Sequence, residues 1–140
     1  MTKHFTFAVV SIVAMGSVAG CARGCVPTPL SEGEARQLVM AVPDAIAVEK
    51  VGGKVTAESY VPPQRKRVFY YFTLTTTLTK ATLLDNGIIG YFSVNKQTAR
   101  VVNVAEKDVA GKELERLQVT LRAQHCIDQS LIDKEKDVAQ

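Results

Sequence analysis

Few side chains in this sequence have the chemistry of a nucleophile or a general base. The histidines are His4, near the start of the chain, and His125, which Cys126 follows directly. A nucleophile needs a base within hydrogen-bond reach, but neighbouring residues of a helix project about 100° apart, so these two side chains do not form a working pair. A zinc site needs about four Cys or His ligands, which Cys21, Cys25, Cys126 and one nearby histidine do not supply at suitable spacing. We therefore expect no catalytic residue, no metal and no cofactor.

Carboxylates are the other reactive groups available, because two acidic side chains can act together as general acid and general base. Most of the acidic residues fall in polar turns or on helix faces that we expect to be solvated. A hydrolase would have to bring together carboxylates from distant segments, such as Glu58, Asp85 and Glu106. Acid–base hydrolysis is therefore kept as an alternative to a non-catalytic role.

One run of like charge stands out, Arg65-Lys66-Arg67. It fits either a solvated loop that protects a strand edge from aggregation or a contact with an anionic surface, which would be lipid head groups or an acidic protein. Five aromatic side chains can flank such a contact or pack on a sheet: Tyr60, Phe69, Tyr70, Tyr71 and Tyr91. The formal net charge of +3 and the lack of a long basic stripe argue against a nucleic-acid partner.

The first part of the chain predicts the helix and the turn that precede these residues. Residues 31–34, Ser-Glu-Gly-Glu, have the pattern of a helix capping box, and apolar residues follow at helical spacing until Pro43, which should end the helix. Residues 46–51 and 54–57 then flank Gly52-Gly53. Two glycines between β-compatible runs predict a tight hairpin.

The second part of the chain predicts more strands and a last helix. Residues 68–78 are rich in aromatic and β-branched side chains, as strands prefer. Residues 88–94 and 99–105 predict an antiparallel pair, and a leucine stripe from Ala110 onward predicts a helix that Asp108 can cap. The fold class expected is α+β: an N-terminal helix, an antiparallel sheet of four to five strands and a C-terminal helix packed on one face of the sheet.

The start of the chain has the features of a secretory signal peptide. Lys3 precedes an uncharged stretch from Phe5 to Ala19 that ends in small residues, and this stretch is shorter than the ~20 residues of a spanning helix. Val18-Ala19-Gly20-Cys21 resembles the lipobox of bacterial lipoproteins. The resemblance implies cleavage before Cys21, acylation of Cys21 and anchoring in a membrane, and Ala22 in place of Asp favours the outer membrane by analogy with enterobacterial sorting. The alternatives are cleavage that releases a soluble protein and an uncleaved anchor.

The two other cysteines are expected to form a disulfide. If Cys21 is acylated, Cys25 and Cys126 remain in an exported protein, where a pair of cysteines is usually oxidised. The alternative is that Cys25 lies in a flexible tether and that Cys126 is a small buried residue on a helix.

Four segments follow from these patterns: a signal peptide over 1–20, a flexible tether over 21–30, one domain over 31–132 and a charged, frayed terminus over 133–140. The sequence favours a lipid-anchored protein of the bacterial cell envelope. It would be a non-catalytic binding module for a periplasmic or surface protein, of the assembly-factor or immunity-inhibitor type. A hydrolase or a purely structural membrane lipoprotein are the alternatives.

Overall fold

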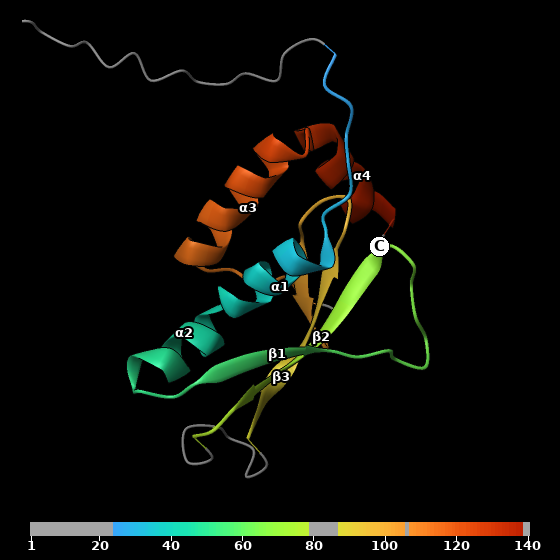
Figure 1. Cartoon of the computed structure of the whole chain (residues 1–140). Coiled ribbons are helices and arrows are strands. Elements are labelled where there is room, and N and C mark those ends of the chain that lie inside the picture. The colour runs from blue at the N-terminus through green and yellow to red at the C-terminus, as the bar shows by residue number, and fades with distance from the viewer. Residues whose placement is uncertain (1–23, 79–86, 106, 139–140) are drawn as a thin grey trace, which may run out of the picture.

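A computed structural model describes residues 24–78, 87–105 and 107–138 of the chain. The predicted signal peptide, Cys21 and residues 79–86 lie outside this range. Within it, four helices flank a four-stranded antiparallel sheet, which confirms the α+β class (Figure 1). No helix of this range is long and apolar enough to cross a membrane.

Two short helices open the domain. Helix α1 (Glu32–Met40) begins at the predicted capping box: the Glu34 amide donates to the Ser31 hydroxyl at 3.3 Å, and the Ser31 amide donates to the Glu34 carboxylate at 2.7 Å. Helix α2 (Pro43–Lys50) occupies most of the segment predicted to form the first strand of a hairpin, so the hairpin prediction was wrong. Pro43 occupies the first turn of α2, where a missing N–H is tolerated, so it begins a helix just after the previous one ends.

The sheet has the strand order β1-β2-β3-β4, and every neighbouring pair is antiparallel. Strands β2 (Phe69–Thr76) and β3 (Ile88–Asn95) agree closely with the predicted strands. Strand β1 is Val55–Ser59, and β4 is only Val101–Asn103. Ala99 has a φ of 58° and so belongs to the β3–β4 turn, which explains why β4 is shorter than the predicted strand.

Two helices complete the fold, α3 (Lys112–Gln124) and α4 (Gln129–Val138). The residue that caps α3 is Gly111 and not Asp108, which instead bonds Arg100 and bridges Val102 beside β4. The frayed terminus expected over 133–140 is also wrong for the part described, because α4 continues to Val138. Glu135 of α4 accepts a hydrogen bond of 2.7 Å from the side-chain amide of Asn95, and this contact holds α4 on the end of β3.

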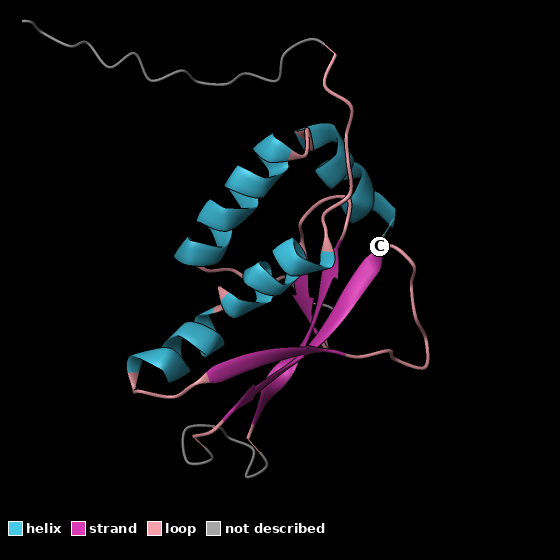
Figure 2. Ribbon diagram, in the orientation of Figure 1, coloured by secondary structure: helices cyan, strands magenta, loops and turns pink. Residues whose placement is uncertain are grey.

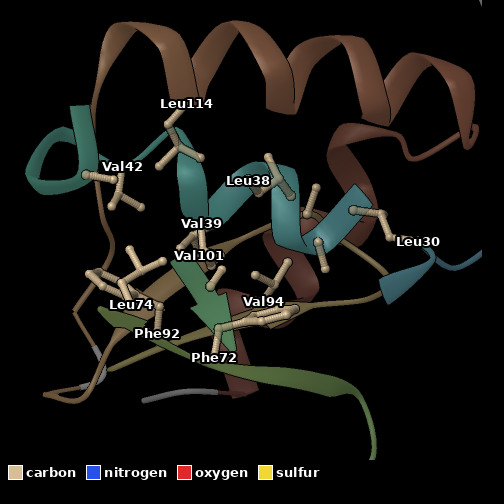
Figure 3. Packing of buried hydrophobic residues seen from close by; sticks show 14 of the residues in the cluster. Leu30, Leu38, Val39, Val42, Phe72, Leu74, Phe92, Val94, Val101 and Leu114 are labelled. Carbon is tan, nitrogen blue, oxygen red and sulfur yellow. The ribbon is translucent and has the colours of Figure 1, made fainter. Parts of the chain in front are cut away.

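The core lies between the sheet and helices α1, α2 and α3. Figure 3 shows side chains from these helices meeting those of β2, β3 and β4, with Leu38, Phe72, Leu74, Val94 and Leu114 fully buried. Figure 2 shows these helices on one side of the sheet. Along β2 the residues that alternate with Phe72 and Leu74 are only partly buried, so the opposite face of β1 and β2 stays open to solvent.

Candidate functional site

A pocket of about 190 Å³ lies where β1 ends and β2 begins. We call it the Arg65 pocket. Its lining residues come from α1, from the end of β1 and the loop after it, from the start of β2 and from the β3–β4 turn: Glu32, Ser59, Tyr60, Val61, Arg65, Phe69, Tyr70, Tyr71 and Lys96. The pocket thus brings Arg65 of the basic run together with four of the five aromatic residues that the sequence singled out.

Aromatic rings form the wall of this pocket. Because side chains alternate along a strand, Phe69 and Tyr71 lie on the open face of the sheet, whereas Tyr70 lies on the helix side. Tyr60 packs edge-on against Tyr71 and Tyr91, with ring centroids 5.9 and 5.7 Å apart. Burial, followed by the neighbouring Tyr71 and Tyr91, raises the pKa of the Tyr60 phenol, so it stays protonated and neutral at pH 7. Tyr91 is 37% exposed and extends the cluster onto the sheet surface.

The charges in the pocket are unequally matched. Glu32 accepts a hydrogen bond from Arg36 at 3.1 Å and another from Ser59, so its negative charge is already compensated. Among the described residues, no carboxylate lies within ion-pair distance of Arg65 or Lys96. Lys96 Nζ lies 4.3 Å from the centroid of the Tyr70 ring, a cation–π contact. The pocket therefore presents two cations beside aromatic rings.

The basic run is divided by the structure. Arg65, Lys66 and Arg67 are all exposed, but only Arg65 lines the pocket. The backbone amide of Lys66 donates to the Tyr71 hydroxyl at 3.0 Å, which ties the loop to the open face of the sheet. Lys96 could not be predicted as part of the pocket, because it falls in a turn that is distant in the chain from Arg65 and carries no motif.

A second cluster fastens the N-terminal segment to the end of α3, and we call it the N-terminal clasp. It comprises the Cys25–Cys126 disulfide and the side chains of Thr28, Glu34 and His125. The structure pairs the two cysteines as predicted, with Cα atoms 5.9 Å apart. Cys126 itself follows α3 with a φ of 55°, and so it lies in a turn and not on a helix.

The side chains of the clasp form a continuous chain of hydrogen bonds. His125 Nε2 lies 2.8 Å from Glu34 Oε1, and His125 Nδ1 lies 2.9 Å from the Thr28 hydroxyl. An ionised carboxylate only accepts, so Nε2 donates to Glu34 and, in the neutral ring, Nδ1 accepts from Thr28. The bond from His125, then the bonds from Ser31, lower the pKa of Glu34 from 4.5 to about 2.

Hydroxyl, imidazole and carboxylate in this order are also the parts of an activated nucleophile. Here the same residues fasten the chain: the Thr28 amide donates to the His125 carbonyl at 3.0 Å, and Glu34 completes the α1 capping box. The Arg65 pocket contains neither Thr28 nor His125. We interpret the cluster as a structural fastening. Sequence reasoning missed the contact between His125 and Glu34, whose residues are 91 positions apart.

The prediction of a flexible tether over 21–30 is wrong for its second half. Cys25 is bridged to Cys126, Thr28 is bonded to His125, and the Leu30 amide donates to the Lys96 carbonyl at 2.8 Å. Leu30 is also 2% exposed and packs into the core. Residues 25–30 are therefore part of the domain.

Of the three carboxylates considered for hydrolysis, the structure describes only Glu58. Glu58 is exposed on β1, and Asp85 and Glu106 lie outside the described residues. Within the described range, no group of three or more His, Cys, Asp or Glu side chains is placed to hold a metal ion. Glu135, whose side chain is 14% exposed, contacts Asn95, Thr98 and Arg100 and so joins α4 to the β3–β4 turn.

Comparison with known proteins gives no family. No family model matches the chain, and no curated protein matches it. Among solved structures, it is similar to a chain in the structure of a type VI secretion system effector–immunity complex from Pseudomonas protegens. The identity is 20%, the TM-score is 0.49, and the match covers 78% of this chain and 88% of the other. At this level the similarity supports no statement about what this chain binds.

Proposed function

We propose that this protein is a lipid-anchored binding module of the bacterial cell envelope that recognises another protein without catalysing a reaction. The observation that carries the proposal is the Arg65 pocket together with Tyr91 beside it. Tyrosine and arginine are the side chains most enriched at the energetic centres of protein interfaces. This surface offers four tyrosines and an arginine in one place. An assembly factor or an immunity-type inhibitor would both use such a surface.

The lipid anchor is a proposal that depends on the lipobox-like residues Val18 to Cys21. One acyl chain binds a membrane only marginally, so stable anchoring requires more than one. We expect the change Cys21→Ser to move the protein from the membrane fraction to the soluble fraction after cell lysis. Immunoblotting of the two fractions measures this, with Lys54→Gln at an exposed position as a control that leaves the anchoring residue and the disulfide intact. Retention of the Cys21→Ser variant in the membrane fraction would contradict lipid anchoring.

Protein recognition can be tested by photo-crosslinking from the open face of the sheet. A photoreactive phenylalanine analogue placed at Tyr91 should give one dominant adduct with an envelope protein in intact cells. The matched control is the same analogue at Val119, which is 66% exposed on α3 and distant in sequence from the aromatic cluster. Equal adducts from both positions, or none from Tyr91, would contradict a binding role for this surface.

A further inference from the structure

We infer that the Arg65 pocket receives a carboxylate group from an acidic segment of the protein partner, an Asp or Glu side chain held between Arg65 and Lys96. This inference rests on the proposed function, since it names the chemistry of the partner at the same surface. It accounts for two cations in one small pocket whose acidic lining residue, Glu32, is bonded to Arg36 and Ser59 and forms no described ion pair with either cation.

The backbone fixes where Lys96 lies. Its amide donates to the Val68 carbonyl at 2.9 Å, and its carbonyl accepts from the Leu30 amide at 2.8 Å. Its ammonium group is further held over the Tyr70 ring, and the Tyr70 hydroxyl donates to the Leu30 carbonyl at 3.2 Å. A group that is already ordered loses little conformational entropy when it binds a ligand. The Lys96 ammonium group is thus positioned to donate hydrogen bonds to an anion.

The walls of the pocket strengthen an ion pair formed inside it. Phe69, Tyr70 and Tyr71 are each only partly exposed and line the pocket together with the two cations, with Lys96 over the Tyr70 ring. Attraction between opposite charges increases as the local dielectric constant falls. Arginine adds a planar pair of donors that matches the two oxygens of a carboxylate. Carboxylate binding is therefore favoured more here than at an isolated exposed lysine.

The shape of the site favours a protein segment over lipid head groups. A membrane surface contacts protruding basic side chains, and the exposed Arg67 would serve that purpose equally well outside the pocket. The two cations of the pocket instead adjoin the Tyr60–Tyr71–Tyr91 cluster on the sheet, where rings lie 5.7 to 5.9 Å apart. A partner that places an acidic residue in the pocket can pack apolar or aromatic neighbours on these rings.

The test uses the full chain, purified in a non-ionic detergent, and two fluorescent peptides. One peptide alternates glutamate and tyrosine, and the other has glutamine in place of every glutamate. Fluorescence anisotropy should show at least tenfold tighter binding of the glutamate peptide, weakening with added salt. Arg65→Gln and Lys96→Gln should each reduce that affinity at least fivefold, whereas Lys54→Gln, before β1, should not. Equal binding of the two peptides, or binding of neither, overturns the inference.

Two further outcomes separate this inference from its alternatives. The first outcome uses flotation of the Cys21→Ser chain with phosphatidylglycerol vesicles. If Arg65→Gln and Lys96→Gln abolish this flotation and leave peptide binding unchanged, the two cations bind lipid head groups, and the inference is overturned. If the Tyr91 photo-adduct forms in cells and neither substitution reduces it, the proposed function stands and the acidic segment is wrong. Loss of the adduct in both variants, with unchanged thermal melting, supports the inference.

Discussion

The N-terminal clasp and the Arg65 pocket both contact the segment that enters the domain, the clasp through Cys25 and Thr28 and the pocket through the bond from Leu30 to Lys96. They differ in whether their charged groups are paired. In the clasp the Glu34 carboxylate is satisfied by His125 and Ser31, and a disulfide closes the cluster. In the pocket Arg65 and Lys96 lie among aromatic lining residues, and no described carboxylate forms an ion pair with them. The difference indicates that the first cluster stabilises the fold, and it agrees with the ligand-binding role that we propose for the second. Substitutions in the clasp should change stability, and substitutions in the pocket should change binding.

The largest effect is expected at the disulfide. In the chain-entropy model a bridge that closes a loop of about 100 residues stabilises a protein by up to ~4.7 kcal/mol, and here the cysteines are 101 positions apart. Cys126→Ser should lower the free energy of unfolding by up to that amount, as measured by urea denaturation. Wild-type protein reduced with dithiothreitol is the matched control and should unfold like the variant. Equal midpoints for the variant and the oxidised wild type would show that the clasp does not stabilise the fold.

An intermediate effect is expected at Glu34. Its pKa is about 2 in the folded protein against 4.5 for the free side chain, so its ionised form favours folding. This contribution is complete above pH 4.5 and is lost as the pH falls toward 2. Because the side chain is 27% exposed, we expect Glu34→Gln to cost only about 1 to 2 kcal/mol at pH 7.

Urea denaturation between pH 2 and pH 7 measures the Glu34 effect. The difference between wild type and Glu34→Gln should shrink as the pH falls from 4.5 to 2. Glu113→Gln is a suitable control, because Glu113 also lies in the first turn of a helix but forms an exposed pair with Arg116. A difference that is constant over this pH range would contradict the role assigned to the Glu34 carboxylate.

The smallest effect on stability is expected in the pocket. Arg65 is exposed and has no described carboxylate partner, so Arg65→Gln should change the free energy of unfolding by less than about 0.5 kcal/mol. The same urea titration at pH 7 checks this. A loss above about 1 kcal/mol would mean that Arg65 supports the fold, and the contrast between the two regions would disappear.

Some elements were predictable because their signals are local. Ser31 and Glu34 form the capping box that their spacing predicts, since both partners lie within one helical turn. The aromatic and β-branched stretch that forms β2 was equally clear. The helix at Pro43–Lys50 was not, because a proline that ends one helix can also begin the next, and two glycines after it suggested a hairpin turn.

The candidate site was only half predictable. Arg65 and the tyrosines were singled out from charge and composition, and the structure places them together. Lys96 was not predicted, because backbone hydrogen bonds to Val68 and Leu30, which are distant in the chain, place it in the pocket. Glu135 was expected in a frayed terminus, yet it joins α4 to Asn95. This contact was unpredictable for the same reason, because the charged residues of a helix do not indicate which distant segment supplies their polar partners.

By itself the sequence indicated the fold class, the capping box and the strongest strands, because these depend on residue spacing within one element. It favoured the pairing of Cys25 with Cys126, which the structure shows. The tertiary structure decided which distant side chains meet. His125 is hydrogen-bonded to Glu34, and Lys96 shares a pocket with Arg65. Hydrogen bonds and packing between distant segments produce both contacts, and these segments have no local sequence pattern in common. The physical reason is that strand pairing and helix packing fix such contacts only once the whole domain is assembled.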